Sequence, residues 1–353
     1  MRILVLGDSY CPSSMFQPSF GALTGIDGVD YDDLVDEPAW RPATPSERSV
    51  KEVLGSPDQV IAKLGEQEIL VVQGAPVTDA VLDAAPIRLV AVARGGPVNI
   101  DLAAAAARGI PVVTTPGKNA TAVAELTIAC LVLLARQAIE AIRWIDGGGE
   151  FGIDNYEGAR WLGHDLAGHT LGLVGFGQVG RRVAARAAAF EMRILAHDPY
   201  MPDDAVRAGG AEPVGLDALV AESDHISLHA RLSADNRGLF DARRFAQMRR
   251  GATFVNTARA ELADEAALHE ALVSGHLAGA AVDVASGRPT GAAHPLVGLP
   301  NVIVMPHIGG ATVDTLETGG RLAAAEVARF IAGQPLVNVA NREGLAAPGG
   351  GPR

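Results

Sequence analysis

The chain has 353 residues, which is more than one hydrophobic core usually organises, so its length favours two domains. Hydrophobic residues make up 48% of the chain and charged residues 20%, which is typical of a folded α/β protein and excludes a largely disordered one. The formal net charge of −12 would repel a phosphate backbone, so nucleic acid is not an expected partner.

The two cysteines predict neither disulfides nor a metal cluster, and the apolar runs predict neither a signal peptide nor a membrane span. Cys11 and Cys130 are too few for a disulfide framework and suggest no metal cluster, so we expect two reduced thiols and no metal. The apolar stretch after Met1 is too short for a signal peptide, and the longest apolar run, Leu126–Ala135, is too short to span a bilayer. The sequence therefore predicts a cytoplasmic protein with no membrane partner.

Short apolar runs rich in β-branched residues alternate with helical patterns, which is the signature of parallel sheets. The first set predicts a small sheet, with strands at Arg2–Leu6, Glu68–Val72, Arg88–Ala93 and Pro111–Thr114. A helix at Asp101–Arg108 lies between the last two strands. One long helical pattern then runs from about Ala120 to Ile145, and its apolar middle must be buried against another domain or subunit. We interpret it as the crossover between domains.

A second set of six strands follows, in an order that suits a Rossmann-type doubly wound sheet. These strands lie near Leu171–Gly175, Arg193–His197, His225–His229, Ala252–Asn256, Gly279–Asp283 and Asn301–Met305. A last helix, about Thr312–Ile331, is expected to pack on the first domain. We therefore predict a Rossmann domain over residues 119–307. Residues 1–118 and 308–341 would form a second, smaller flavodoxin-like α/β domain, and residues 342–353 a disordered tail.

The pattern GxGxxG comes directly after a predicted strand and directly before a helical pattern, which makes it far more specific than the pattern alone. Gly175 permits a tight turn, Gly177 lets the backbone approach a pyrophosphate, and Gly180 lets the helix pack close to the strand. Gln178 and Val179 belong to the first turn of that helix, whose unpaired amides would hold the diphosphate. The motif predicts a dinucleotide cofactor.

Asp198 ends the second strand of this unit, about 20 residues after the glycines, where an acid accepts hydrogen bonds from the adenosine ribose. A carboxylate at this position would repel a 2′-phosphate, so the sequence favours NAD over NADP. The alternative is a structural glycine turn, with Asp198 as a turn residue before Pro199.

Three later segments place polar residues at the carboxyl ends of strands, where ligands bind in open α/β sheets. They are Asn256–Arg259, the segment from Asp283 to Pro289, and the segment from Pro306 to Thr312. With them the chain resembles the D-2-hydroxyacid dehydrogenase family, which includes phosphoglycerate and glycerate dehydrogenases, from its first strand to about residue 341. Matching stretches include Asn99–Asp101, Arg108–Pro111, Val123–Glu125, Gly168–Gly172, Asn256–Arg259, His294–Leu296, Leu299–Val302 and Pro306–Ile308.

The resemblance implies two catalytic residues and sets of substrate-binding and cofactor-binding residues. Arg259 would bind the substrate carboxylate and carbonyl, and His307 would exchange a proton with the substrate hydroxyl. A surface charge and a strand-end cap are the plainer interpretations of these two residues. The matching segment whose backbone amides hold the substrate carboxylate consists of Arg94, Gly95 and Gly96, with Gln73 and Gly74 as further candidates for the same cleft. The remaining cofactor candidates are Thr257, Ala258 and Asp283, of which Asp283 matches the residue near the nicotinamide carboxamide.

One position departs from the family. A glutamate five residues after the position of Asp283, just before a proline, pairs with the catalytic histidine in the family; here Arg288 stands before Pro289. A nearby guanidinium would lower the pKa of His307 by like-charge repulsion, which would leave a neutral base suited to alcohol oxidation. The usual carboxylate–imidazole pair is therefore not expected.

Two other interpretations of Arg288 stay open. Together with Arg94 it would engage a second anionic group of the substrate, such as a carboxylate or a phosphate. Alternatively, it is a solvated loop residue, and a water or another acid, with Glu261 and Asp264 nearby in sequence, orients the histidine.

Two function hypotheses follow. The first is an NAD-dependent dehydrogenase that moves a hydride between the nicotinamide and the α-carbon of a small 2-hydroxy or 2-keto acid. The second is a dinucleotide-sensing protein on the same fold with weak or no turnover, which the missing glutamate supports. The resemblance also implies a homodimer, formed through the cofactor domain and the predicted long helix.

Overall fold

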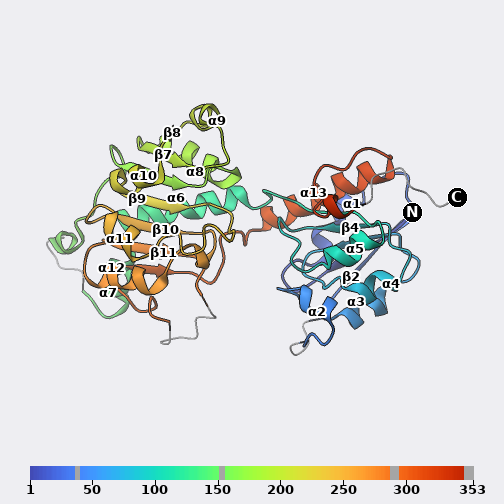
Figure 1. The fold of residues 1–353 in the computed structure, drawn as a ribbon. Helices are drawn as coiled ribbons and strands as arrows, with labels where there is room; N and C mark the ends of the chain where they lie inside the picture. Colours follow the sequence, from blue (N-terminus) through green and yellow to red (C-terminus); the bar gives the residue numbers. More distant parts are fainter. Residues whose placement is uncertain (36–39, 151–155, 287–293, 346–353) are drawn as a thin grey trace. The chain divides into compact units, whose positions relative to one another are not determined.

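The structure is a computed structural model, and it describes residues 1–35, 40–150, 156–286 and 294–345. The chain forms two compact units, Met1–Lys118 with Thr312–Arg353 and Asn119–Ala311. Figure 1 shows the red helix α13 (Val313–Ile331) among the blue elements of the first unit, so both ends of the sequence contribute to that unit. The second crossing between the units comes after Ala311, whereas the sequence prediction placed it after residue 307.

The first unit contains five parallel strands in the order β2-β1-β3-β4-β5, which is the flavodoxin-like order. The α/β fold class with two parallel sheets is therefore confirmed. The strand β2 was not predicted, because its residues are partly exposed and acidic, as is common at a sheet edge. The strands are β1 (Arg2–Gly7), β2 (Gly28–Asp33), β3 (Ile69–Val72), β4 (Leu89–Val92) and β5 (Val112–Val113).

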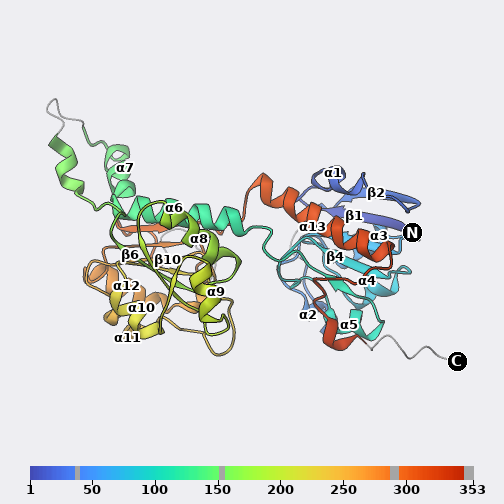
Figure 2. The same cartoon turned by 90° about the horizontal axis from the view of Figure 1, so that it is seen from above.

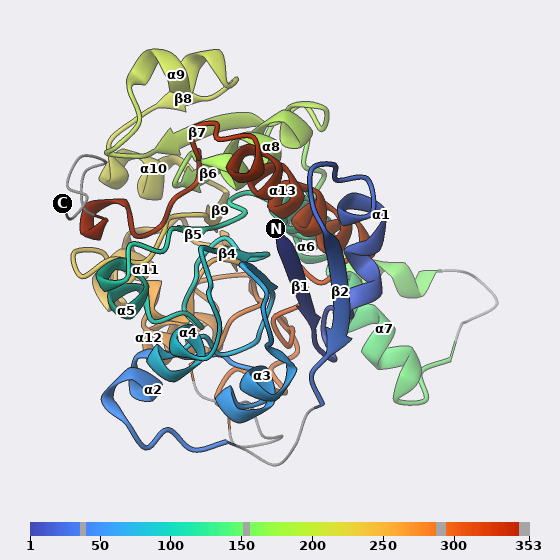
Figure 3. The ribbon, with the colours of Figure 1, turned by 90° about the vertical axis from the view of Figure 1, so that its right-hand side faces the viewer.

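Helices cover both faces of this sheet, as Figure 3 shows. One face packs on α13 and α1, and the other packs on α3, α4 and α5. The side chain of Asp101 accepts a hydrogen bond from the N–H of Ala104 and so starts the predicted helix α5. The bounds are α1 (Gln17–Phe20), α2 (Pro45–Ser49), α3 (Pro57–Lys63), α4 (Asp79–Asp83), α5 (Leu102–Ala107) and the short 3₁₀ helix η1 (Ser13–Met15).

The described part of the predicted tail, residues 342–345, contains regular structure. Residues 342–353 were expected to be a disordered tail, but the 3₁₀ helix η5 (Arg342–Gly344) lies within that range. The guanidinium of Arg342 donates hydrogen bonds to the carbonyls of Leu336 and Val337, which ties η5 to the preceding segment. Residues 346–353 lie outside the described part of the chain.

The second unit contains seven parallel strands in the order β12-β11-β10-β9-β6-β7-β8. Six of them correspond to the predicted strands, and the unpredicted β8 is a two-residue edge strand with no apolar run to indicate it. The strands are β6 (Thr170–Val174), β7 (Arg193–His197), β8 (Glu212–Pro213), β9 (His225–Leu228), β10 (Thr253–Asn256), β11 (Gly279–Val282) and β12 (Val302–Val304).

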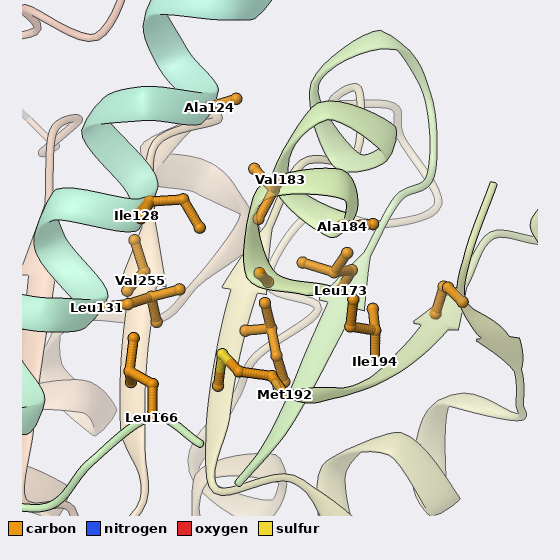
Figure 4. Packing of buried hydrophobic residues seen from close by; sticks show 14 of the residues in the cluster. Ala124, Ile128, Leu131, Leu166, Leu173, Val183, Ala184, Met192, Ile194 and Val255 are labelled. Atoms are coloured by element: carbon orange, nitrogen blue, oxygen red, sulfur yellow. The ribbon is translucent and has the colours of Figure 1, made fainter. Parts of the chain in front are cut away.

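The sheet of the second unit lies between two helical layers. Figure 2 shows α6 and α8 over one face and α10, α11 and α12 over the other. Ile128 and Leu131 of α6 and Val183 of α8 point toward Leu173 and Val255 of the sheet (Figure 4). Burying each such side chain contributes about 1.5–3 kcal/mol. The bounds are α6 (Ala120–Ala135), α8 (Gln178–Ala188), α9 (Asp203–Ala208), α10 (Leu216–Glu222), α11 (Ala242–Gln247), α12 (Glu265–Val273), η2 (Tyr156–Trp161) and η3 (Ala260–Leu262).

The single long helix predicted from Ala120 to Ile145 is wrong. The segment forms α6 and a separate helix α7 (Ala138–Asp146), bent by 72° at a break where Gln137 adopts a left-handed conformation. The carbonyl of Ala135 accepts the N–H of His164 at 2.8 Å, so a distant segment takes the place of the next helical turn. Among the described residues no single helix is long and apolar enough to cross a membrane, and the pair passes that test by length and composition only.

Two histidines meet at the amino edge of the seven-stranded sheet. Nδ1 of His169 lies 3.2 Å from Nε2 of His225, and Nδ1 of His225 lies 2.8 Å from Oγ1 of Thr253. Burial and, to a lesser extent, the neighbouring His169 lower the pKa of His225 to about 4, while Asp224 opposes the shift. The neutral imidazole is therefore the form that the fold accommodates.

This histidine predicts a loss of stability in acid. Because the pKa of His225 is lower in the folded chain (about 4) than in the unfolded chain (about 6.5), the unfolded chain binds the extra proton first. Its contribution to the free energy of unfolding is complete above pH 6.5 and should fall by about 2 kcal/mol between pH 7.5 and pH 5. Urea unfolding of the wild type and of His225→Asn at both values measures this, and an equal decline in the two proteins would contradict it.

Candidate functional site

The carboxyl ends of five neighbouring strands in the second unit lie in line. Val174 pairs with Leu228, Leu228 with Asn256, Asn256 with Val282, and Val282 with Val304. Each strand is followed directly by a predicted site segment or by a loop beside one. The residues that the sequence analysis selected after β6, β10, β11 and β12 are therefore gathered at one edge of the sheet.

The glycine motif lies at this edge as the turn from β6 into α8. Gly175 has φ +94°, and a Cβ there would lie 2.5 Å from the backbone nitrogen of Ala230, so the turn requires glycine. A Cβ on Gly180 would overlap the carbonyl oxygen of Gly175, so the helix can approach the strand this closely only because residue 180 is glycine. Gly177 differs, because a Cβ there would meet nothing within 4 Å. Packing of the chain does not explain that glycine.

The residues present fit a dinucleotide. Open space over Gly177 is what the backbone needs to approach a diphosphate, and no side chain caps the N-terminus of α8. Gln178 accepts a hydrogen bond from Arg182 at 2.8 Å through Oε1, and Val179 packs against the core beneath the helix. The first turn of α8 therefore keeps its amides available for a phosphate.

The carboxylate of Asp198 lies at the end of β7, beside the glycine turn. Oδ2 accepts the N–H of Phe176 at 2.8 Å, and Oδ1 accepts the N–H of Tyr200 at 3.0 Å. Asp198 thus holds the second residue of the glycine turn in addition to any role toward a ribose.

Arg259 follows β10 on a turn that Asn256 organises. The Asn256 amide donates to the carbonyl of Arg259 at 2.9 Å and accepts the N–H of Ala258 at 3.0 Å. The Arg259 side chain is exposed, and its guanidinium donates to the carbonyl of Ala258 but forms no ion pair within the described residues. Thr257 is buried, with Oγ1 3.2 Å from Oγ1 of Thr127 on α6. The turn therefore presents an unpaired cation.

His307 lies on a turn that a buried carboxylate holds. Its φ is +61°, a left-handed conformation that is uncommon outside glycine and concentrates at functional sites. Asp283 is only 1% exposed, and its two oxygens accept the N–H groups of Ile308 at 2.8 Å and Gly309 at 2.7 Å. The imidazole is exposed, with no hydrogen bond within the described ranges. Sequence analysis assigned Asp283 to the cofactor and missed this second role.

The acids considered as partners of His307 are engaged elsewhere. Asp264 accepts the N–H groups at the start of α12, and Glu261 lies 3.9 Å from Arg237. Glu265 accepts a hydrogen bond from Ser286 and lies 3.2 Å from Nε2 of His294. Arg288 and Pro289 fall outside the described residues. No cluster of three or more metal-ligating side chains occurs among the residues that the structure describes.

The predicted substrate segment of the first unit follows β4. The Arg94 guanidinium forms an ion pair with Glu52 and donates to its carbonyl at 3.0 Å. Gly95 and Gly96 are exposed, and a Cβ on Gly96 would meet nothing within 4 Å. As at Gly177, packing of the chain does not require the glycine at Gly96.

Sequence analysis did not select His229 as a site residue, although it follows β9 at the same edge of the sheet. Its backbone and that of Ala230 border Gly175, and Nε2 of its ring lies 3.0 Å from Oγ of Ser227. Burial lowers the pKa of His229 to about 3, so the ring is neutral. A polar residue at the end of a predicted strand was the available signal.

Comparisons with known proteins show which family the chain resembles. A family model described as "D-isomer specific 2-hydroxyacid dehydrogenase, NAD binding domain" matches residues 128–309. The chain is 35% identical over 81% of its length to D-3-phosphoglycerate dehydrogenase of Archaeoglobus fulgidus, of which it spans 54%. It is 34% identical to the glyoxylate reductase of Korarchaeum cryptofilum, over 85% of this chain and 88% of that one. The solved NAD complex of Staphylococcus aureus formate dehydrogenase superposes with a TM-score of 0.71 and 26% identity, over 96% of this chain and 97% of that one.

Replacement by alanine should have different effects at Gly177 and at Gly175. Gly177→Ala should keep the melting temperature and weaken NADH binding, because only a ligand needs that space. Gly175→Ala should lower the free energy of unfolding by more than 1 kcal/mol, because it combines a left-handed φ with a backbone overlap. Thermal melting and NADH fluorescence titration measure both effects. Normal NADH affinity in Gly177→Ala would remove the main structural support for a diphosphate at this turn.

Proposed function

Because the chain belongs to the D-isomer specific 2-hydroxyacid dehydrogenase family, we propose that it is an NAD-dependent oxidoreductase. It transfers a hydride between the nicotinamide and the α-carbon of a small 2-hydroxy or 2-keto acid. The chain spans about half the length of the phosphoglycerate dehydrogenase it matches, and nearly the whole length of the glyoxylate reductase.

One observation carries the proposal: the carboxyl edge of the second sheet gathers the glycine turn, Arg259 and His307. The cation has no acidic partner and the imidazole no hydrogen bond among the described residues. Both are exposed at an edge where α/β proteins bind ligands. A purely structural role would not require a cation and an imidazole together at this edge.

Each residue of this edge has a role in the reaction. The planar Arg259 guanidinium binds the substrate carboxylate and carbonyl and so orients the α-carbon. His307 takes the proton of the hydroxyl during oxidation and returns it during reduction. Asp283 fixes the turn that carries the imidazole. NAD, when bound, supplies or accepts the hydride.

The replacement of the family glutamate by Arg288 shapes the direction of catalysis. We propose that His307, without the family's partner carboxylate, serves chiefly as the base for alcohol oxidation. No carboxylate in the described ranges is hydrogen-bonded to its ring, which supports this proposal. In the open alternatives Arg288 faces an anionic substrate group together with Arg94, or lies in solvent.

A dinucleotide-sensing protein is the second candidate, and the observation that favours it is the same replacement. Such a protein would bind NAD(H) at the glycine turn without efficient turnover. NADH absorbance in the presence of 2-keto acids, and NAD⁺ reduction in the presence of 2-hydroxy acids, separate the two functions.

We also propose a cytoplasmic homodimer. The helix α7 has no buried residue, and Ile142 is 52% exposed, which supports an interface along this part of the second unit.

Removal of the two site residues should separate chemistry from cofactor binding. Arg259→Ala and His307→Ala should each lower kcat/KM by at least a hundredfold, because each removes a group that contacts the reacting atoms. NADH affinity should stay within twofold of the wild type. An equal loss of NADH binding in both variants would argue for structural roles.

Restoring the acid should change the pH profile. In Arg288→Glu a carboxylate would raise the pKa of His307, so reduction should continue to higher pH, because the protonated acid persists. Initial rates of 2-keto acid reduction from pH 5.5 to 9 measure this. An unchanged profile would mean that position 288 does not act on the histidine.

A further inference from the structure

Lys118 is partly buried and forms no ion pair within the described residues. It is the last residue of the first unit before the chain enters the second. Its side chain packs along α13, where a Cβ at Gly319 would lie 3.1 Å from its Cδ and 3.5 Å from its Nζ. Burial lowers the pKa of the ammonium. In the described part of the chain no carboxylate forms an ion pair with it and no acceptor is hydrogen-bonded to it.

An arrangement of this kind costs stability. An ammonium withdrawn from water without a compensating charge is unfavourable, so a lysine kept only for packing would be better replaced by an apolar side chain. Buried ionisable groups with shifted pKa values concentrate at functional sites. Lys118 is therefore a candidate for contact with a ligand.

A second cation lies close by. The Arg94 guanidinium is near enough to lower the pKa of Lys118, while Cys11 and Asp8 oppose that shift. Burial raises the pKa of the Cys11 thiol to about 12, so the thiol is uncharged at neutral pH. The Asp8 carboxylate accepts the backbone N–H groups of Cys11 and Gly74 at 2.8 Å each. The Asp8 carboxylate is thus bound by backbone donors, Glu52 is paired with Arg94, and neither carboxylate forms an ion pair with Lys118.

Two buried oxygens at the same edge have no partner within the described residues. They are Oε1 of Gln73, which follows β3, and Oγ1 of Thr115, which follows β5. The N–H of Thr115 donates to the carbonyl of Arg94, so these loops are adjacent. Buried polar atoms are rarely left unpaired in the absence of a ligand or water. Of the two, the Thr115 hydroxyl can donate a hydrogen bond to an anion, so it is an observation independent of the two cations that indicates a binding surface at the carboxyl edge of the first sheet.

We propose that Lys118, with Arg94, binds a second anionic group of the substrate at this edge and so selects 2-keto and 2-hydroxy acids that carry a further carboxylate or phosphate. The inference rests on the proposed function. The proposed function assigns the carboxylate beside the reacting carbon to Arg259, which leaves Lys118 for the second group.

Three 2-keto acids test the proposal: 2-oxobutanoate has an apolar end, oxaloacetate a carboxylate and phosphonooxypyruvate a phosphate. The wild type should prefer one of the two acids with a second charge, which identifies the group. Lys118→Met should raise KM for that acid by about tenfold to a hundredfold and leave KM for 2-oxobutanoate within twofold. Lys118→Arg should recover part of the loss. Lys63→Met, which removes a partly exposed lysine paired with Asp32, is the matched control.

Thermal melting separates ligand binding from a structural role. Lys118→Met should keep or raise the melting temperature, because it removes a partly buried charge that has no ion-pair partner among the described residues, and a lower melting temperature would overturn the proposal. An equal rise in KM for all three acids, an unchanged KM, or a wild type that prefers 2-oxobutanoate would also overturn it.

If the wild type reduces none of the acids, the proposed function fails but the binding inference can still be measured. Calorimetric titration of oxaloacetate and phosphonooxypyruvate into wild type and Lys118→Met, with NADH present, then decides. Binding that depends on Lys118 supports the inference, and equal binding or none to both proteins rejects it.

Discussion

The hydrogen bonds between the Asp283 carboxylate and the amides of Ile308 and Gly309 are the constraint on which the candidate site depends. A left-handed φ at a residue such as His307 costs about 1–3 kcal/mol, and two charge-assisted hydrogen bonds in a buried position offset a cost of that size. Gly309 has to be glycine, since a Cβ there would lie 2.7 Å from a carboxylate oxygen. One buried acid thus fixes the imidazole on a strand end that is already in line with the glycine turn.

Much of this arrangement could be predicted because its signals are local. Buried parallel strands appear as apolar runs, and the glycine spacing at the end of β6 reflects the turn itself. The edge strands β2 and β8 lack such runs and were missed. The break between α6 and α7 follows from a hydrogen bond between Ala135 and the distant His164, and no local pattern records it.

The hydrogen-bond and ion-pair partners of side chains were harder to predict from the sequence than the positions where strands end. Nothing near Arg94 in the sequence indicates that Glu52 pairs with it, because the two residues meet only when separate loops converge. The burial of Lys118 depends on α13, which the chain reaches much later, so its desolvated ammonium could not be recognised from the sequence alone. The spacing of motifs along the sequence predicts which residues lie at the same edge of a sheet. Which charges at that edge are paired depends on the whole fold.

The position of α13 also has a consequence for the order in which the protein is synthesised. One face of the first sheet, which includes Ile3 and Val5, packs on Ala323 and Val327 of this helix. A ribosome therefore completes the entire NAD-binding unit before the first unit can bury that face. During this interval the early strands expose apolar surface, the kind of surface that chaperones bind and that promotes aggregation. Burial of these early strands therefore waits for the return of the late helix to them.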